Sequence, residues 1–304
     1  MKTIYIKYGE KIDNIGPISI CLGYFDGIHQ GHRKLILKAL ECKEKVAFLT
    51  FDKSPSDVYK GIESPILTSI EDKEEILEKL HVDYLVCLKN DKALLDVSPS
   101  DFIDNILLPL GVKNVICGFD YHFGKNRVGD YSFLKEYGGQ SFNTFKVDEV
   151  VFEGKKISST LIRELILNGE IEKANYLLEK DYTIKGEVIK GNQIGRKLNF
   201  PTINIEMKHN YLLPPNGVYA SLVFIDGIKY YSVTNVGVHP TVGASNRILI
   251  ESYIFDFSQE IYGKSVSLSF KKFIRHERDF SSSNELKKQI SKDAIDVKDY
   301  FSNF

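Results

Sequence analysis

The chain has 304 residues, enough for two domains of ordinary size, with 43% hydrophobic and 27% charged residues as in soluble globular proteins. Its 40 basic and 41 acidic residues nearly cancel, so we expect neither nucleic acid nor an anionic membrane as a partner. No apolar run of about 18 residues could cross a bilayer, and the start of the chain lacks the apolar core of a signal peptide. These features predict a cytoplasmic protein and leave its oligomeric state open.

Short β-rich segments alternate with helix-like segments through the first half of the chain. Strands are expected at 18–24, 45–51, 83–88, 114–119 and 145–152, and helices at Arg33–Glu44, Ile70–Leu80 and Pro99–Leu110. Ser69 can cap the second of these helices. The alternation predicts an α/β domain with a parallel, Rossmann-like sheet covered on both sides. Three of the four cysteines lie in the strand-like segments, which favours reduced cysteines of the core.

The second half begins with two expected helices, Ser158–Leu167 and Glu170–Glu179, and after them the residue composition changes. After Asp181 the segments are short, β-branched and aromatic, with Gly, Asn and Asp turns between them, which predicts a small antiparallel β-barrel. A final helix is indicated by Ser282, three residues before Glu285, which is the spacing of a capping box. We therefore predict two domains, residues 1–180 and residues 181–304.

The segment CLGYFDGIHQGHRKLI, residues 21–36, places two histidines among glycines directly after an apolar strand. A metal site, a phosphate site and an ordinary surface turn are all compatible with it, although zinc needs three or four ligands. Gly27 and Gly31 permit close approach of the backbone to an anion. A helix beginning near Gly31 would direct its free N–H groups to the same place, where His29 and His32 could donate hydrogen bonds. The residues thus favour a phosphate site.

The same segment resembles a known signature. GYFDGIHQGH, residues 23–32, is similar to the HxGH signature of the nucleotidyltransferase superfamily, and with its FDG it resembles the FMN adenylyltransferase module of bacterial FAD synthetases. The resemblance implies that His29 and His32 are catalytic. It also implies contacts to ATP or flavin from four further positions: Gly23, Phe25, Asp26 and Gly27.

Two later segments agree with this resemblance. KKISSTLIREL, residues 155–165, resembles the ISSTxIR segment of the family, which implies anion binding by Ser158, Ser159, Thr160 and Arg163. GFDYHFGKNRVGD, residues 118–130, resembles its GxDFxFG segment, which implies nucleotide or flavin binding by Asp120 and aromatic walls from Tyr121 and Phe123. One position departs from the pattern, because Ser54 stands where family members usually have a histidine.

The C-terminal half carries no P-loop, since GNQIGRK is one residue too short for that pattern. It instead resembles the riboflavin kinase domain in five segments in order: GRKLNFPTIN (195–204), NGVYA (216–220), NVGVHPTVG (235–243), ESYIFDF (251–257) and IRHERDF (274–280). The resemblance implies that Glu251 is the general base and that Thr202 and Asn204 bind Mg²⁺, whose preferred ligands are oxygens. Contacts to ATP or flavin are implied for Gly191, Gly195, Lys197 and Arg275.

Together the resemblances predict a bifunctional flavin-cofactor enzyme of the bacterial FAD synthetase family, with riboflavin kinase and FMN adenylyltransferase activities. Its substrates and products would be riboflavin, FMN and FAD, with ATP as co-substrate and Mg²⁺ as cofactor. Two alternatives stay open at this point. One is an adenylyltransferase whose barrel only binds flavin, and the other is a flavin or nucleotide sensor without catalytic activity.

Overall fold

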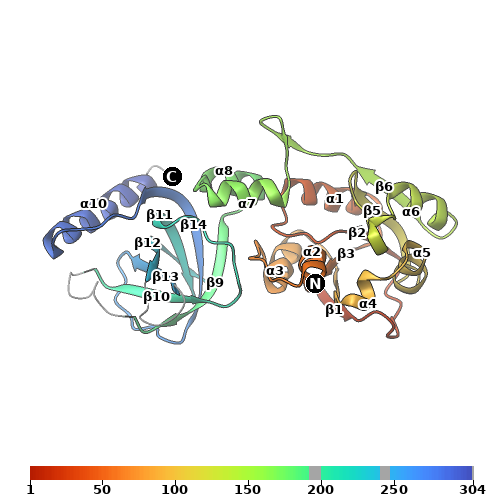
Figure 1. Ribbon diagram of the computed structural model, residues 1–304, viewed down its shortest axis with the longest axis horizontal. Helices are drawn as coiled ribbons and strands as arrows, with labels where there is room; N and C mark the ends of the chain where they lie inside the picture. The colour runs from red at the N-terminus through yellow and green to blue at the C-terminus, as the bar shows by residue number, and fades with distance from the viewer. Residues whose placement is uncertain (192–199, 240–246, 303–304) are drawn as a thin grey trace. The chain divides into compact units, whose positions relative to one another are not determined.

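The computed structural model describes residues 1–191, 200–239 and 247–302. These residues form two compact units, Met1–Ser159 and Thr160–Phe304. Figure 1 shows a sheet with its helices in the first unit and a barrel with a terminal helix in the second. The second unit includes the two helices that precede the barrel, and the helix at residues 171–178 packs on two of the barrel strands.

The first unit contains a six-stranded sheet in the order β1-β4-β3-β2-β5-β6, and every neighbouring pair is parallel. Its strands are β1 (Lys2–Ile6), β2 (Ile18–Leu22), β3 (Lys45–Phe51), β4 (Tyr84–Leu88), β5 (Val112–Gly118) and β6 (Asn143–Val147). The predicted parallel α/β fold is confirmed. The chain order reverses between β2 and β5, and at such a switch point the carboxyl ends of the two strands leave a crevice for ligands.

Apolar side chains fill both faces of this sheet. On one face, residues of α1 (Gln30–Glu41) and α3 (Ile70–Lys79) pack on alternate strand residues such as Phe48 and Ile116. On the other face lie α5 (Pro99–Phe102), the π-helix η1 (Ile103–Leu107) and α6 (Tyr131–Gly138), which cover Ile20 and Val115. Burial on both faces explains why these strands read as continuous apolar runs.

The structure gives more detail on three helices that the sequence predicts, and two of them differ from the expectation. Helix α1 begins three residues before Arg33, because its first turn carries polar residues that hydrophobic periodicity does not detect. Helix α3 has a full capping box, in which Asp72 N–H donates to Ser69 Oγ and Ser69 N–H donates to Asp72 Oδ2. The helix expected over Pro99–Leu110 is divided into α5 and η1. The smaller elements of this unit are α2 (Pro55–Lys60), α4 (Lys92–Leu95), the 3₁₀ turn η2 (Lys125–Arg127), β7 (Val151–Phe152) and β8 (Lys155–Lys156).

The second unit is a closed barrel of six antiparallel strands in the order β10-β13-β12-β11-β14-β9, as predicted. Its strands are β9 (Tyr182–Ile189), β10 (Thr202–Met207), β11 (Gly217–Ile225), β12 (Ile228–His239), β13 (Arg247–Ile254) and β14 (Ser265–His276). Helices α7 (Ser159–Leu167) and α8 (Ile171–Leu178) precede it. Asn175 ties α8 to the barrel, since its amide donates to the Phe270 carbonyl and accepts from the Tyr182 N–H.

The terminal helix α10 (Ser283–Ser302) packs Ala294 and Val297 on Ala220 and Phe255 of the barrel wall. Only half of the expected capping box forms at its start. Glu285 N–H donates to Ser282 Oγ at 3.2 Å, but the Glu285 carboxylate accepts from the N–H and hydroxyl of Ser281. The helix is nevertheless capped. Its Glu285 carboxylate accepts from Ser281, one residue before the position that the capping-box spacing predicts.

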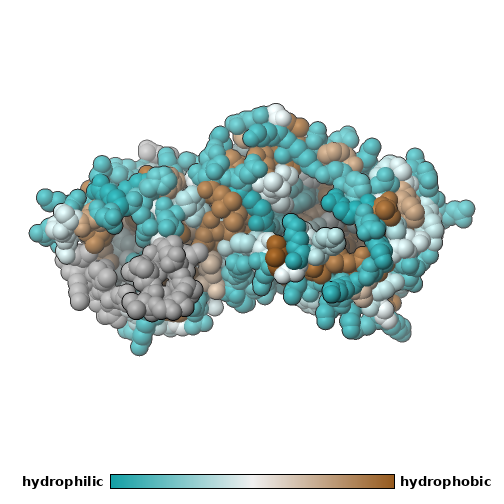
Figure 2. Space-filling view, viewed as in Figure 1, coloured by the Kyte–Doolittle hydropathy of each residue, from teal (hydrophilic) through white to brown (hydrophobic). Residues whose placement is uncertain are grey.

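Hydrophilic residues cover most of the surface seen in Figure 2, and hydrophobic residues appear there in small groups. None of the helices in the described residues is long and apolar enough to cross a membrane. All four cysteines are free, and Cys21, Cys87 and Cys117 are buried in the first unit's sheet. The expectation of reduced core cysteines agrees with this placement.

Candidate active sites

The loop between β2 and α1 forms the first candidate site, at the carboxyl edge of the sheet. Gly27 has a φ of +92°, which favours glycine, and Phe25 and Ile28 also adopt positive φ values of 56° and 48°. Helix α1 then begins at Gln30, with His29 as its N-cap and no side-chain hydrogen bond to the first turn. A tightly turned loop therefore precedes a helix N-terminus without a side-chain cap, where N–H groups can bind an anion.

His29 and His32 lie together at this helix N-terminus. Their rings stack with centroids 3.6 Å apart and an angle of 20° between the planes. Gly31 makes this possible, because a Cβ at that position would lie 3.1 Å from the His29 ring. The edge of His32 also meets Phe25, with ring centroids 5.0 Å apart. Within the described residues the Nδ1 atoms of both histidines are buried without a hydrogen-bond partner.

Both imidazoles are neutral at pH 7. Burial, followed by the nearby Lys156 ammonium, lowers the pKa of His29 from 6.5 to about 4. Burial, followed by the proximity of His29, Lys73 and Lys156, lowers the pKa of His32 well below its ordinary value. Each ring then carries one N–H donor and one acceptor nitrogen. The pair can donate to phosphate oxygens, and a bound polyanion would raise the pKa of both rings.

Asp26 has a structural function that the sequence did not reveal. Its buried Oδ1 accepts hydrogen bonds from the N–H groups of Leu67 and Thr68, at 2.9 and 3.0 Å, and from the Thr68 hydroxyl. The same hydroxyl accepts from the Gly27 N–H at 3.0 Å. Asp26 therefore anchors the loop to the segment that leads into α3. Its predicted contact with ATP or flavin stays a prediction, as does that of Gly23, which packs against the Phe25 ring.

The second anion-binding segment of the sequence lies at the start of α7. The Ser159 hydroxyl donates to the Asp26 carbonyl at 2.7 Å, so this serine and the loop of the histidine pair are in direct contact. Ser158 precedes the helix, whereas Thr160 and Arg163 lie on it and are counted with the second compact unit. The expected phosphate contacts of these four residues stay predictions. Ser54 caps α2 without a side-chain hydrogen bond.

Asp120 follows β5, the neighbour of β2 across the switch point, and its predicted contact with nucleotide or flavin stays a prediction. Its carboxylate forms an ion pair with Lys156 of β8, whose ammonium lies 4.6 Å from the centroid of Phe119. The positive charge of Lys156 acts on both histidines, although the sequence alone does not indicate a role for this residue. Phe123 is buried in the core with Tyr121 packed beside it, and the aromatic walls expected from these two residues stay a prediction.

The second candidate site is a row of side chains across the barrel strands. Asn204 of β10 is paired in register with Glu251 of β13, which is paired with Asn235 of β12. Residues opposite each other in neighbouring strands share one face of the sheet. The register continues from Asn235 through Val218 to Arg275 of β14. Four polar residues from distant parts of the chain thus share one face, and Asn235 was not singled out from the sequence.

Asn204 is well placed to bind a cation. Its side chain is 5% exposed, and its Oδ1 has no hydrogen-bond partner among the described residues. Gly191 packs so closely that a Cβ there would lie 2.2 Å from the Asn204 amide nitrogen. Thr202 lies two residues earlier on β10 and shares its face. A buried amide oxygen without a hydrogen-bond partner among the described residues, with a hydroxyl two residues away on the same face of the strand, fits the oxygen ligands of Mg²⁺. Gly195 and Lys197, predicted to contact ATP or flavin, lie outside the described residues.

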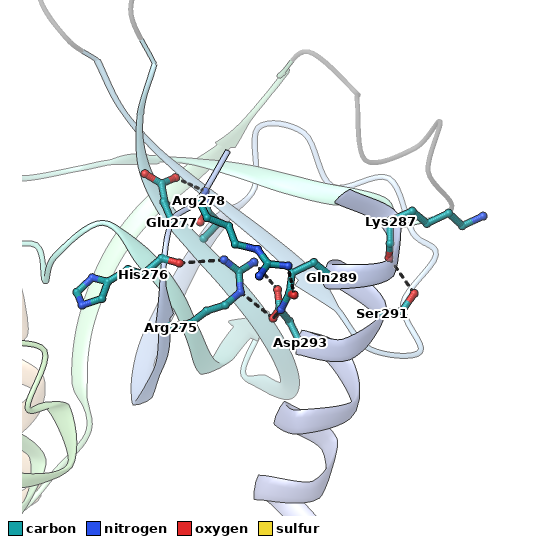
Figure 3. Close-up of polar contacts among 9 residues, drawn as sticks. Arg275, His276, Glu277, Arg278, Lys287, Gln289, Ser291 and Asp293 are labelled. Atoms are coloured by element: carbon teal, nitrogen blue, oxygen red, sulfur yellow. Dashed lines mark hydrogen bonds and ion pairs between the residues drawn. The ribbon is translucent and has the colours of Figure 1, made fainter. Parts of the chain in front are cut away.

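Arg275 is engaged by the terminal helix (Figure 3). Its Nε and Nη2 donate to the two carboxylate oxygens of Asp293, at 2.8 and 2.6 Å, and its Nη1 donates to the His276 carbonyl. Gln289 also donates to Asp293, at 2.7 Å. The predicted contact of Arg275 with phosphate or flavin stays a prediction. What the structure adds is a bidentate ion pair that holds α10 against β14.

Comparisons with known proteins agree with two sites on two domains. The family model described as FAD synthetase matches residues 12–161, and the model described as riboflavin kinase matches residues 178–301. A bifunctional riboflavin kinase/FMN adenylyltransferase of Listeria monocytogenes is 37% identical over 99% of both chains. The chain belongs to this family. The Bacillus subtilis member is 36% identical, and the alignment covers 100% of this chain and 99% of that protein.

A solved structure shares the whole fold with this family member. The crystal structure of a protein described as a macrolide-efflux protein from Streptococcus pneumoniae superposes with a TM-score of 0.90. It is 30% identical, and the alignment covers 97% of this chain and 98% of that one. The two family models together span both candidate sites, with the histidine pair in one and Glu251 in the other.

Proposed function

We propose that this chain converts riboflavin to FAD in two steps at two separate sites. At the barrel, a ribityl hydroxyl oxygen of riboflavin attacks the γ-phosphorus of ATP, and FMN and ADP are formed. At the first site, a phosphate oxygen of FMN attacks the α-phosphorus of ATP, and FAD and pyrophosphate are formed. One observation carries this proposal, namely that each of two matched families covers one group of converging polar residues.

In the kinase step the chain supplies a base and an oxygen-lined site. The Glu251 carboxylate accepts the proton of the attacking hydroxyl. Asn204 and Thr202 would hold Mg²⁺, which when bound neutralises charge on the phosphate oxygens. The unpaired Asn204 Oδ1 supports this assignment. Gly191, Gly195, Lys197 and Arg275 are proposed to contact ATP or flavin.

In the adenylylation step the chain supplies donors and a fixed loop. His29 and His32 are proposed to donate to the phosphates, where negative charge increases in the transition state. The remaining contacts to ATP or FMN are assigned to Gly23, Phe25, Asp26, Gly27, Asp120, Ser158, Ser159, Thr160 and Arg163. The stacked, neutral rings at an uncapped helix N-terminus support this assignment. Phosphoryl chemistry of this kind rests on positioning and charge, so a covalent nucleophile is not needed.

The proposal also covers the boundary between the two domains and the location of the protein in the cell. We assign residues 1–180 to adenylylation and residues 181–304 to the kinase, supported by a riboflavin kinase match that begins at residue 178. The proposed partners are ATP, riboflavin and FMN, without nucleic acid or membrane. A cytoplasmic location follows from these substrates.

The test is a time course with the purified protein, riboflavin, ATP and Mg²⁺, with separation of the flavins. FMN should appear first and FAD second, and removal of Mg²⁺ with a chelator should stop FMN formation. Glu251→Gln should prevent FMN formation but still make FAD from added FMN, whereas His32→Ala should do the reverse. Loss of both activities in either folded variant would contradict separate sites, and FAD formed only from added FMN by the wild type would favour the adenylyltransferase alone.

A further inference from the structure

A buried lysine lies directly behind the loop of the first site. Lys73 of α3 is 1% exposed and is among the largest fully buried side chains of the described chain. Its ammonium donates to the Tyr24 carbonyl at 2.8 Å and to Thr50 Oγ1 at 3.1 Å, and it lies 4.4 Å from the centroid of the Tyr24 ring. A buried ammonium is costly unless it is bound by polar groups. Here those groups belong to the loop and to the end of β3.

The Tyr24 carbonyl is held by two donors at once. Besides Lys73, the Thr50 hydroxyl donates to it at 2.7 Å. A peptide group is planar, so a fixed Tyr24 carbonyl also fixes the direction of the Phe25 N–H on its opposite edge. Phe25 has a φ of 56°, a conformation that a side-chain-bearing residue retains only when its surroundings hold it. Lys73 is one of the groups that hold this turn.

The charge of Lys73 also reaches the site. Its ammonium acts on His32 and attracts Asp26, and both residues belong to the segment that begins at the loop. Asp72 on its own helix and Cys87 on β4 are the other titratable groups that act on it. Burial outweighs these attractions and lowers the pKa of Lys73 to about 8. A buried cation is screened less than a surface one, so it can stabilise phosphate charge across the loop.

We propose that Lys73 is a positioning residue for adenylyl transfer, which holds the Tyr24–Phe25 peptide and places a positive charge behind the phosphate-binding loop. This inference rests on the proposed function of the first site. It assigns a role to a helix residue that lies outside every motif of the sequence. The role depends on the protonated form, because a neutral amine provides neither the charge nor the full set of donors.

The test is the pH dependence of kcat/KM for ATP in FAD formation from FMN, between pH 7.5 and 9.5, because this quantity reports ionisations of the free enzyme. The phosphates of FMN and ATP are ionised throughout this range. Of the groups around Lys73, His32 is already neutral, and Cys87 has a pKa raised to about 12. The wild type should therefore lose activity by about eightfold between pH 7.5 and 9.

Three variants sharpen the experiment. Lys73→Met should reduce kcat/KM at pH 7.5 at least tenfold and should show no alkaline decline, whereas Lys73→Arg should retain activity at pH 9.5 because guanidinium stays charged. Lys79→Met removes an exposed lysine of the same helix and should behave as the wild type. Riboflavin phosphorylation, measured on the same samples, should be unchanged in all three.

The outcomes separate this inference from the proposed function. Wild-type protein that makes FAD at pH 7.5 but shows a flat profile to pH 9.5 overturns the role of Lys73 and leaves the proposed function intact. A decline that Lys73→Arg shares with the wild type also overturns it. Protein that makes no FAD at any pH contradicts the proposed function itself. A flat wild-type profile overturns the proposal even if a variant does not fold.

Discussion

The rings of His29 and His32 stack at 3.6 Å, one imidazole on the other, at the first turn of α1. Two charged imidazolium rings would repel each other at this distance, so the arrangement depends on neutral rings. Burial keeps them neutral at pH 7. The pair thus presents two neutral rings, and the first prediction depends on this state.

The first prediction concerns stability at acid pH. The folded-state pKa of His29, about 4, lies below the unfolded value near 6.5, so the unfolded chain binds a proton that the folded chain does not. The contribution of His29 to stability is therefore complete above pH 6.5 and is lost as pH falls toward 4. At pH 5 the loss should be about 2 kcal/mol.

Urea unfolding followed by circular dichroism at pH 7.5 and 5.0 measures this effect. His29→Asn should lose about 2 kcal/mol less than the wild type between the two pH values, on the linkage relation above. His81→Asn, which alters an exposed histidine, is the control and should lose as much as the wild type. An equal loss in His29→Asn and the wild type would show that His29 is not kept neutral by the fold.

The second prediction concerns the anchor formed by Asp26. Asp26→Ala leaves the buried N–H groups of Leu67 and Thr68 without their acceptor, which should cost about 3 kcal/mol of unfolding free energy. FAD formation from FMN should fall at least tenfold, while riboflavin phosphorylation continues. Asp83→Ala is the control, because Asp83 accepts from the Val46 N–H near the opposite end of the strands. Normal adenylylation in Asp26→Ala would contradict the anchor.

The third prediction compares two glycines with nearly the same φ angle. Gly27 has a φ of +92° and Gly9 a φ of +89°, so alanine at either position should cost about 1–2 kcal/mol of stability. Only Gly27 lies in the loop of the histidine pair. Gly27→Ala should therefore reduce kcat for FAD formation more than tenfold, and Gly9→Ala should leave it unchanged. Equal kcat values for the two variants would argue against a required loop geometry.

The fourth prediction concerns the ion pair that holds α10. Asp293 is 3% exposed, so Asp293→Ala leaves the Arg275 guanidinium without its partner and should cost about 3 kcal/mol. The double variant Arg275→Met with Asp293→Leu should recover most of this loss, because apolar side chains can fill a buried ion-pair site. Asp226→Ala breaks the exposed pair with Lys264 and should cost less than about 1 kcal/mol. Thermal unfolding of the variants measures these differences, and no recovery in the double variant would refute this account of the pair.

Much of this protein could be predicted from the sequence alone. Strand segments with apolar runs fixed the α/β class of the first unit, because strands of a parallel sheet are buried on both faces. The motif GYFDGIHQGH located the histidine pair. The resemblance to the riboflavin kinase domain pointed to Glu251 and Asn204, whose roles in the barrel stay predictions. These features are encoded in short stretches, where spacing and residue type are enough to indicate the chemistry.

Only the tertiary structure decided how distant residues combine. The anchor from Asp26 to Thr68 and the contact of Lys73 with Tyr24 join separate segments of the chain. The engagement of Arg275 by Asp293 likewise depends on how α10 packs. Burial and hydrogen-bond partners arise from packing, and packing is not periodic in sequence. A motif therefore names the groups at a site, whereas the fold sets their charge state and their direction.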